Sequence, residues 1–261
     1  MLTYQEIRPG EALADYIYCY WIFSYQPKDH QEVLEHSIPP DGCFSLAFPH
    51  HPMAPSLGIS LLGPQNSIFR LPVFPGSHCL GIRFMPGVGK ALFGVSPKAW
   101  VDRNLEAEDL IGGLNTGAIF HHWPAQEPDQ AWVDPIFEHW IDEKEVELDE
   151  PILRAVRLIL AADGQVKVSE LAQQVFLSER QFQRRFQEAV GLSPKVFSRI
   201  RRMRAALLQR LLAEKSYADI LFDHGYTDKS HFNRDFAAIA GLSSAELERY
   251  LKQIEHLGLE E

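Results

Sequence analysis

The segment that decides the fold occurs twice in this chain. The first copy, FLSERQFQRRFQEAVGLS, occupies residues 176–193, and the second, YTDKSHFNRDFAAIAGLS, occupies residues 226–243. At an offset of 50 residues, three aromatic positions, one arginine and the Gly-Leu-Ser triplet of the copies coincide, and Phe176 is paired with Tyr226. A similarity that recurs at one fixed spacing indicates a single supersecondary unit used twice. The C-terminal half is therefore expected to be organised around this pair.

Each copy has the pattern of a short helix, a tight turn and a second helix. Apolar residues at helical spacing precede the turn, and two phenylalanines four residues apart mark one face of the second helix. Ser178 and Gln181 form a capping-box pattern at the start of the first copy's second helix. Gly191 and Gly241 stand where a helix commonly ends. Together these signals predict two helix-turn-helix units.

The polar faces of the two second helices are rich in guanidinium and amide groups. Such side chains make paired hydrogen bonds to guanine and adenine edges in the major groove of DNA, whereas an ordinary solvated face is richer in Glu/Lys pairs. The sequence therefore predicts contacts with DNA bases from Arg180, Gln183, Arg184, Lys229, His231, Asn233 and Arg234.

A longer helix is predicted between the copies, from residue 193 to about residue 212. Ser193 is its expected N-cap, and Pro194 takes the first helical position, where proline is tolerated. Such a rod is about 27 Å long, and adjacent major grooves on one side of B-DNA are about 34 Å apart. One chain could thus place two helices in adjacent grooves. The predicted phosphate contacts are Gln187, Lys195, Arg199, Arg202 (or a structural role for this one) and Arg204.

These motifs resemble the paired helix-turn-helix domain of AraC/XylS-type transcription regulators. The matching patterns are S-x3-F-x-R-x-F-x4-G-L-S-P over residues 178–194 and G-Y-x-D-x-S-H-F-x-R-x-F-x4-G over residues 225–241. The chain departs from the family at Ala237, where a basic residue is common, and at Ser244, where proline is common. The resemblance spans roughly residues 150–255. It implies a transcription factor, activator or repressor, whose partners are double-stranded DNA and RNA polymerase.

Length and charge predict a two-domain α+β protein. Residues 1–120 are expected to form a β-rich domain, residues 121–150 an acidic, proline-containing connector with one amphipathic helix, and residues 151–255 an all-α DNA-binding domain. Residues 1–149 hold 8 basic and 20 acidic residues, whereas residues 178–210 hold 9 and 2. Residues 211–261 hold 5 and 10. The first unit is therefore expected to bind DNA more strongly than the second.

The N-terminal region has short β-type runs separated by Pro and Gly, which predict a barrel or sandwich. Strands are expected at 16–25, 44–48, 59–62, 68–74 and 79–84, and helices at 87–93, 107–114 and 131–142. Three elements resemble the cupin-like N-terminal domain of an AraC subgroup: P-D-G-C at 40–43, G-P at 63–64 and G-x-R-F-x-P-G at 81–87. The resemblance implies a sensory domain but carries no agreed ligand.

Other roles for the N-terminal region stay open as alternatives. A barrel could gather the histidines into a metal site of a DNA-tethered enzyme, but the cupin metal pattern is absent, so no metal, cofactor or catalytic residue is predicted. The histidines concerned are His30, His36, His50, His51 and His78. Cys43 is expected to be a small buried thiol. The aromatic run at 16–25 could line a ligand pocket, or the domain could serve only to form a homodimer. No signal peptide or membrane span is predicted, which favours the cytoplasm.

Overall fold

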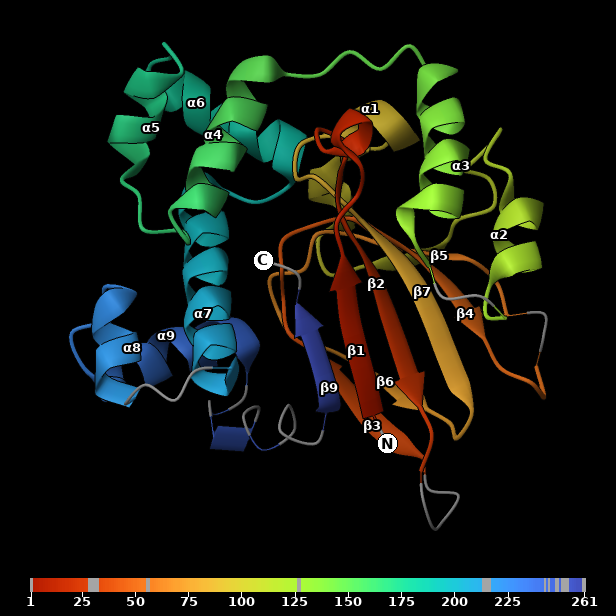
Figure 1. Ribbon diagram of the computed structural model, residues 1–261. Coiled ribbons are helices and arrows are strands. Elements are labelled where there is room, and N and C mark those ends of the chain that lie inside the picture. The colour runs from red at the N-terminus through yellow and green to blue at the C-terminus, as the bar shows by residue number, and fades with distance from the viewer. Residues whose placement is uncertain are drawn as a thin grey trace.

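A computed structural model describes residues 2–27, 33–54, 57–125, 128–212, 217–241 and 254–259, together with residues 243, 245, 246 and 249. Figure 1 shows a β-rich region on one side and, on the other, a group of helices arranged along one long helix. The predicted fold class, a β-rich N-terminal region and a helical C-terminal region with two helix-turn-helix units, is confirmed. Within these described residues, no helix is long and apolar enough to cross a membrane.

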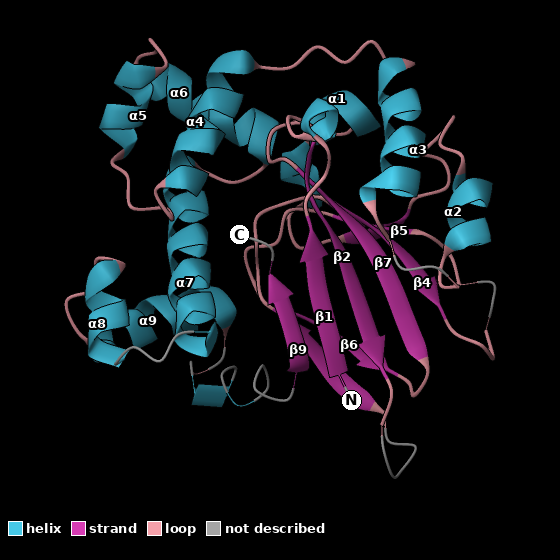
Figure 2. Cartoon of the chain, viewed as in Figure 1, coloured by secondary structure: helices cyan, strands magenta, loops and turns pink. Residues whose placement is uncertain are grey.

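The N-terminal region is built on a seven-stranded sheet, which Figure 2 shows in magenta. Its strands in spatial order are β8 (Asn104–Glu106), β5 (Ser60–Leu62), β4 (Ser45–His50), β7 (Ser77–Phe84), β2 (Ile17–Tyr25), β1 (Leu2–Ile7) and β9 (Ile254–Leu259). Neighbours are antiparallel except β1 and β9, which are parallel. The last strand of the chain thus returns to the edge of the N-terminal sheet.

A second, two-stranded sheet of β3 (Leu34–Ile38) and β6 (Phe69–Val73) covers one face of this sheet. β2 is consequently buried on both sides, which explains its nearly continuous apolar run. Tyr20 points into the larger core, whereas Trp21 and Phe23 belong to the layer under the small sheet. The five predicted strands are confirmed as β2, β4, β5, β6 and β7. The sequence reading missed β1, β3, β8 and β9.

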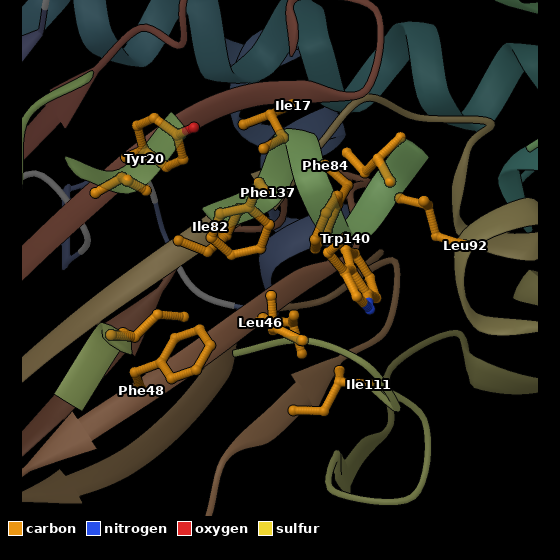
Figure 3. Packing of buried hydrophobic residues seen from close by; sticks show 14 of the residues in the cluster. Ile17, Tyr20, Leu46, Phe48, Ile82, Phe84, Leu92, Ile111, Phe137 and Trp140 are labelled. Atoms are coloured by element: carbon orange, nitrogen blue, oxygen red, sulfur yellow. The ribbon is translucent and has the colours of Figure 1, made fainter. Parts of the chain in front are cut away.

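Helices close the other face of the large sheet. They are α1 (Gly89–Phe93), α2 (Thr116–His122) and α3 (Gln130–Asp142), with 3-10 turns η1 (Glu11–Leu13) and η2 (Pro97–Trp100). Phe137 and Trp140 of α3 pack against Phe84 of β7 in the main core (Figure 3). The amphipathic helix of the connector is therefore buried on the β-rich region. The helix predicted at 107–114 is wrong, since isolated turns run through this segment and Gly113 adopts a φ of 84°.

The C-terminal region is all-helical, as predicted. Its elements are α4 (Glu150–Ala161), α5 (Val168–Gln174), α6 (Glu179–Val190), α7 (Pro194–Leu212), α8 (Tyr217–Asp223) and α9 (Lys229–Ala240). The predicted capping box is present, because Ser178 and Gln181 exchange side chain–backbone hydrogen bonds. Gly191 and Gly241 end α6 and α9 in the left-handed conformation. These local signals therefore set the helix boundaries that the sequence indicated.

The two units differ by one residue in their turns. The left-handed turn residue is Phe176 in the first unit, with φ 57°, and Gly225 in the second, with φ 70°. The N-caps that follow are Ser178 and Asp228. First helices therefore correspond at an offset of 49 and second helices at 50. The pairing of Phe176 with Tyr226 read from sequence is wrong, since Phe176 is exposed and Tyr226 is buried.

One core runs through both units along α7. Phe182 and Phe186 of α6 and Phe232 and Phe236 of α9 are almost fully buried in it, together with Met203 of α7. In Figure 1, α7 extends from the α4–α6 group at one end to α8 and α9 at the other. The long helix thus joins the two second helices, α6 and α9, as a single rod.

Candidate nucleic-acid interface

The exposed face of α6 carries all three base-reading residues predicted for the first unit. Arg180, Gln183 and Arg184 are exposed, and the buried Phe182–Phe186 pair fixes which side of the helix faces outward. Arg184 pairs with Glu188 at 3.0 Å, and both side chains are more than half exposed. An exposed pair of this spacing stabilises a helix by only about 0.3–0.5 kcal/mol, so Arg184 can exchange it for a DNA base at little cost.

α9 presents a face of different chemistry. Lys229 and Arg234 are exposed, whereas His231 and Asn233 are half-buried. Asp228 caps the helix by accepting a hydrogen bond from the His231 backbone N–H at 2.7 Å. The Arg234 side chain donates a hydrogen bond to the Ser230 backbone carbonyl at 3.3 Å. Each of the two faces therefore carries two exposed cations, but the second lies in more acidic surroundings.

Two of the predicted phosphate contacts bind a carboxylate inside the protein. Arg199 and Arg202 of α7 both pair with Asp235 of α9, at 2.6 and 3.2 Å. The Asp235 carboxylate is only 10% exposed and lies 3.3 Å from the Tyr226 hydroxyl that donates to it. Arg202 also stacks on the Tyr226 ring. These contacts fix the orientation of α9 on α7, a role that sequence reasoning missed for Asp235.

A third predicted phosphate contact, Arg204, is turned toward the N-terminal region. Its guanidinium donates to Glu6 of β1 at 2.9 Å and is 11% exposed. Glu6 also accepts from Arg83 of β7 and from the Tyr4 hydroxyl. Burial alone would raise the pKa of the Glu6 carboxyl, but the facing Arg83 and Arg204 outweigh it and lower the pKa to about 2. Glu6 is therefore ionised at neutral pH and links both regions.

The remaining two predicted phosphate contacts lie near the junction of α6 and α7. Lys195 is exposed in the first turn of α7, and Gln187 is half-buried near the end of α6. Arg185, on the flank of the α6 face, instead forms two hydrogen bonds to Asp149, which caps α4. The first unit thus separates outward-facing polar side chains from those that hold its helices together.

The N-terminal sequence elements meet the helical region directly. Asp41 of P-D-G-C and Arg83 of G-x-R-F-x-P-G form an ion pair at 2.6 Å. Gly42, with φ 73°, lies under the Phe197 ring of α7, where a Cβ atom would come within 2.7 Å of the ring. Gly191 of α6 has equally little space beside Pro97 of η2. The glycines therefore permit close packing between the two regions.

The cysteines and histidines of the described N-terminal residues are partly accounted for by burial and packing. Burial raises the pKa of the Cys43 thiol, and Asp41 adds to the effect, so the thiol is protonated and unreactive at neutral pH. Among the described residues, no cluster of three or more His, Cys, Asp or Glu side chains could hold a metal ion. His30 lies outside these residues. His36 stacks against Phe23, and His78 bonds to Ser24.

Two family descriptions match the chain. Residues 5–106 match a domain of unknown function (DUF6597), and residues 171–250 match a helix-turn-helix domain. The second match extends from within α5 through α9 and so covers most of both units. No curated protein matches the chain.

Several solved structures are similar to the chain. An AraC-type DNA-binding domain protein from Chromobacterium violaceum is 23% identical, over 40% of this chain and 92% of its own, with a TM-score of 0.36. ToxT from Vibrio cholerae O395 is 10% identical over 97% of this chain and 98% of its own, with a TM-score of 0.45. A structure of wild-type ToxT from Vibrio cholerae strain SCE256 with bound unsaturated fatty acid is 10% identical over 95% of this chain and 94% of its own, with a TM-score of 0.45.

The sequence patterns, the helix geometry and the family match of residues 171–250 agree. Two capped second helices present polar faces from the ends of one shared helix. The chain is a DNA-binding transcription regulator with an AraC-type double helix-turn-helix domain.

Proposed function

We propose that a single chain reads an operator of two base blocks in adjacent major grooves. The observation that carries the proposal is the pair of outward polar faces on α6 and α9, held at opposite ends of α7. Arg180, Gln183 and Arg184 read the first block. Lys229, His231, Asn233 and Arg234 read the second, with less affinity because acidic residues surround them.

Fewer residues are available to bind DNA phosphates than the sequence of the long helix indicated. Lys195 and Gln187 contact the DNA backbone, because neither side chain has a hydrogen bond or salt bridge to the protein among the described residues. Arg199 and Arg202 hold α9 in place through Asp235. Arg204 would reach a phosphate only after leaving Glu6. We also propose that the N-terminal region has no catalytic role and controls DNA binding through a small molecule, through homodimer formation, or both, with RNA polymerase as the protein partner.

The test is selection of bound duplexes from a random DNA pool by the full chain. Two enriched blocks about one helical turn apart are expected, because both faces lie on one rod. Arg184→Ala should lower affinity by about 1–3 kcal/mol and relax the choice at one base pair. Lys195→Ala should weaken binding to all DNA sequences alike. It should also reduce the slope of the logarithm of affinity against the logarithm of salt concentration by about one unit.

Arg185→Ala is the matched control for Arg184→Ala. It removes a neighbouring arginine on the same helix that is committed to Asp149, so base preference should stay as in the wild type. Equal loss of affinity across all sequences for Arg184→Ala would rule out base reading by this residue. A pool without any enrichment at moderate salt would reject the sequence-specific function itself.

A further inference from the structure

A cavity lies where the two sheets meet α7. Water molecules could place their centres in about 80 Å³ of it, room for about five to eight waters. A ligand atom needs about the same room as a water, so the space suits one substituted ring. Apolar side chains form most of the wall: Trp21, Phe23, Ile38, Leu62, Leu207 and Leu208.

The charges around this cavity already balance. Arg83 and Arg204 line it, and both are paired with Glu6, while Arg83 also pairs with Asp41. Burial lowers the pKa of His36, another lining residue, to about 4, so its ring is neutral at neutral pH. An anionic ligand would have to break one of these ion pairs, and a cationic ligand would meet two guanidinium groups. The site therefore disfavours a charged molecule.

Neutral hydrogen-bonding groups on the same wall have no partner among the described residues. Gln65, Ser45 and Ser37 are 6%, 5% and 8% exposed, and their side chains form no hydrogen bond within the part of the chain that the structure describes. Trp21 Nε1 is likewise buried without an acceptor among those residues. Of these groups, the buried Trp21 N–H costs stability unless something binds it. A neutral amide in particular could both donate to and accept from the Gln65 side chain.

We propose that this cavity binds a compact, uncharged aromatic molecule bearing an amide or carbonyl group, and that its occupancy is the signal to α7. The inference rests on the proposed function, of which it specifies the small molecule. The ring lies among Trp21, Phe23 and Leu207, and the polar group faces Gln65. Because Arg204, Leu207 and Leu208 belong to the helix that joins both DNA-reading units, the ligand contacts that helix directly.

The experiment compares benzamide with benzoate, two probes of nearly equal size that differ in charge. Binding to the full chain is measured by calorimetric titration and by the shift in thermal midpoint at neutral pH. Benzamide is expected to raise the midpoint and to bind at least tenfold more tightly than benzoate. Equal or tighter binding of benzoate would overturn the proposal, as would no saturable binding of benzamide up to millimolar concentration.

Gln65→Leu tests the amide contact while keeping the side chain similar in size. It should reduce benzamide affinity at least tenfold and leave toluene affinity unchanged or higher. Gln173→Leu, an exposed position on α5, is the control and should behave as the wild type. Unchanged benzamide affinity in Gln65→Leu, or in Ser45→Ala if the first variant does not fold, would place the probe elsewhere. Operator binding by the ligand-free chain tests the proposed function separately, so either idea can fail alone.

Discussion

Asp235→Asn is the most informative single change in the DNA-binding region. The substitution keeps the side-chain size but removes the charge that holds Arg199 and Arg202 against α9. Removing one partner of a fully buried ion pair costs about 3–5 kcal/mol. The two guanidinium groups here are 34% and 22% exposed and keep part of their hydration, so the expected loss is about 2–3 kcal/mol.

Urea denaturation of the full chain, followed by circular dichroism, measures this loss. Glu188→Gln is the control, because it breaks the exposed Arg184 pair and should cost only about 0.3–0.5 kcal/mol. In the duplex selection, Asp235→Asn should lose the second block and keep the first, since among the described residues the partners of Asp235 lie on α7 and beside α9 and none on α6. A stability within about 0.5 kcal/mol of the wild type, or loss of both blocks together, would refute the orienting role of Asp235.

Three further changes probe other parts of the molecule. Phe176→Gly should raise the free energy of unfolding by about 0.5–1 kcal/mol, because removing the exposed ring forfeits no buried packing and glycine adopts φ 57° without strain. A lower denaturation midpoint would show that the ring is needed. Phe186→Ala should cost about 3–5 kcal/mol through a core cavity and abolish operator binding, and near-wild-type stability would contradict the packing. Folded His36 has a pKa of about 4 against 6.5 unfolded, so the unfolded state binds more protons and stability falls as pH drops from about 6.5 to 4. His36→Leu should remove at most about 2 kcal/mol of the stability that the wild type loses between pH 6.5 and 5. An identical loss in both proteins would argue against a contribution of His36.

Helices and caps of the C-terminal region could be predicted because their signals are local. The capping box at Ser178, the glycine ends of α6 and α9, and the paired phenylalanines lie within a few residues of the structure they specify. The one-residue difference between the turns was hidden, because the first turn places Phe176 where glycine is usual. Periodicity alone cannot detect a strained backbone at a bulky side chain.

Strands β1, β3 and β8 escaped prediction for the opposite reason. β8 is only three residues long, and β1 and β3 alternate without a strong apolar run, so their pairing partners define them. The helix expected at 107–114 failed because its apolar residues follow helical spacing while single turns satisfy the backbone. Here non-local contacts, which sequence spacing does not reveal, decide the local structure.

The arginines of α7 show the same limit at the candidate site. By composition alone, Lys195, Arg199, Arg202 and Arg204 looked suited to phosphate oxygens, with a structural role as the alternative for Arg202. Glu6 is 198 residues from Arg204, and Asp235 is 33 from Arg202, so only the fold reveals that these cations are neutralised. The outward residues of α6 were easier to predict, because the buried phenylalanines on the same helix determine which side is exposed.

The N-terminal motifs act together with these arginines. Asp41 and Arg83, from two motifs, form an ion pair with each other. Arg83 also pairs with Glu6, which in turn pairs with Arg204 of α7. Gly42 lets Phe197 of α7 lie directly on the loop beside them. Residues that looked like turn signals for a sensory domain therefore form the surface on which α7 rests. A molecule bound against Arg83 would change the position of α7. Because α6 and α9 are attached to the two ends of that helix, the same change would alter how the polar faces of α6 and α9 meet DNA.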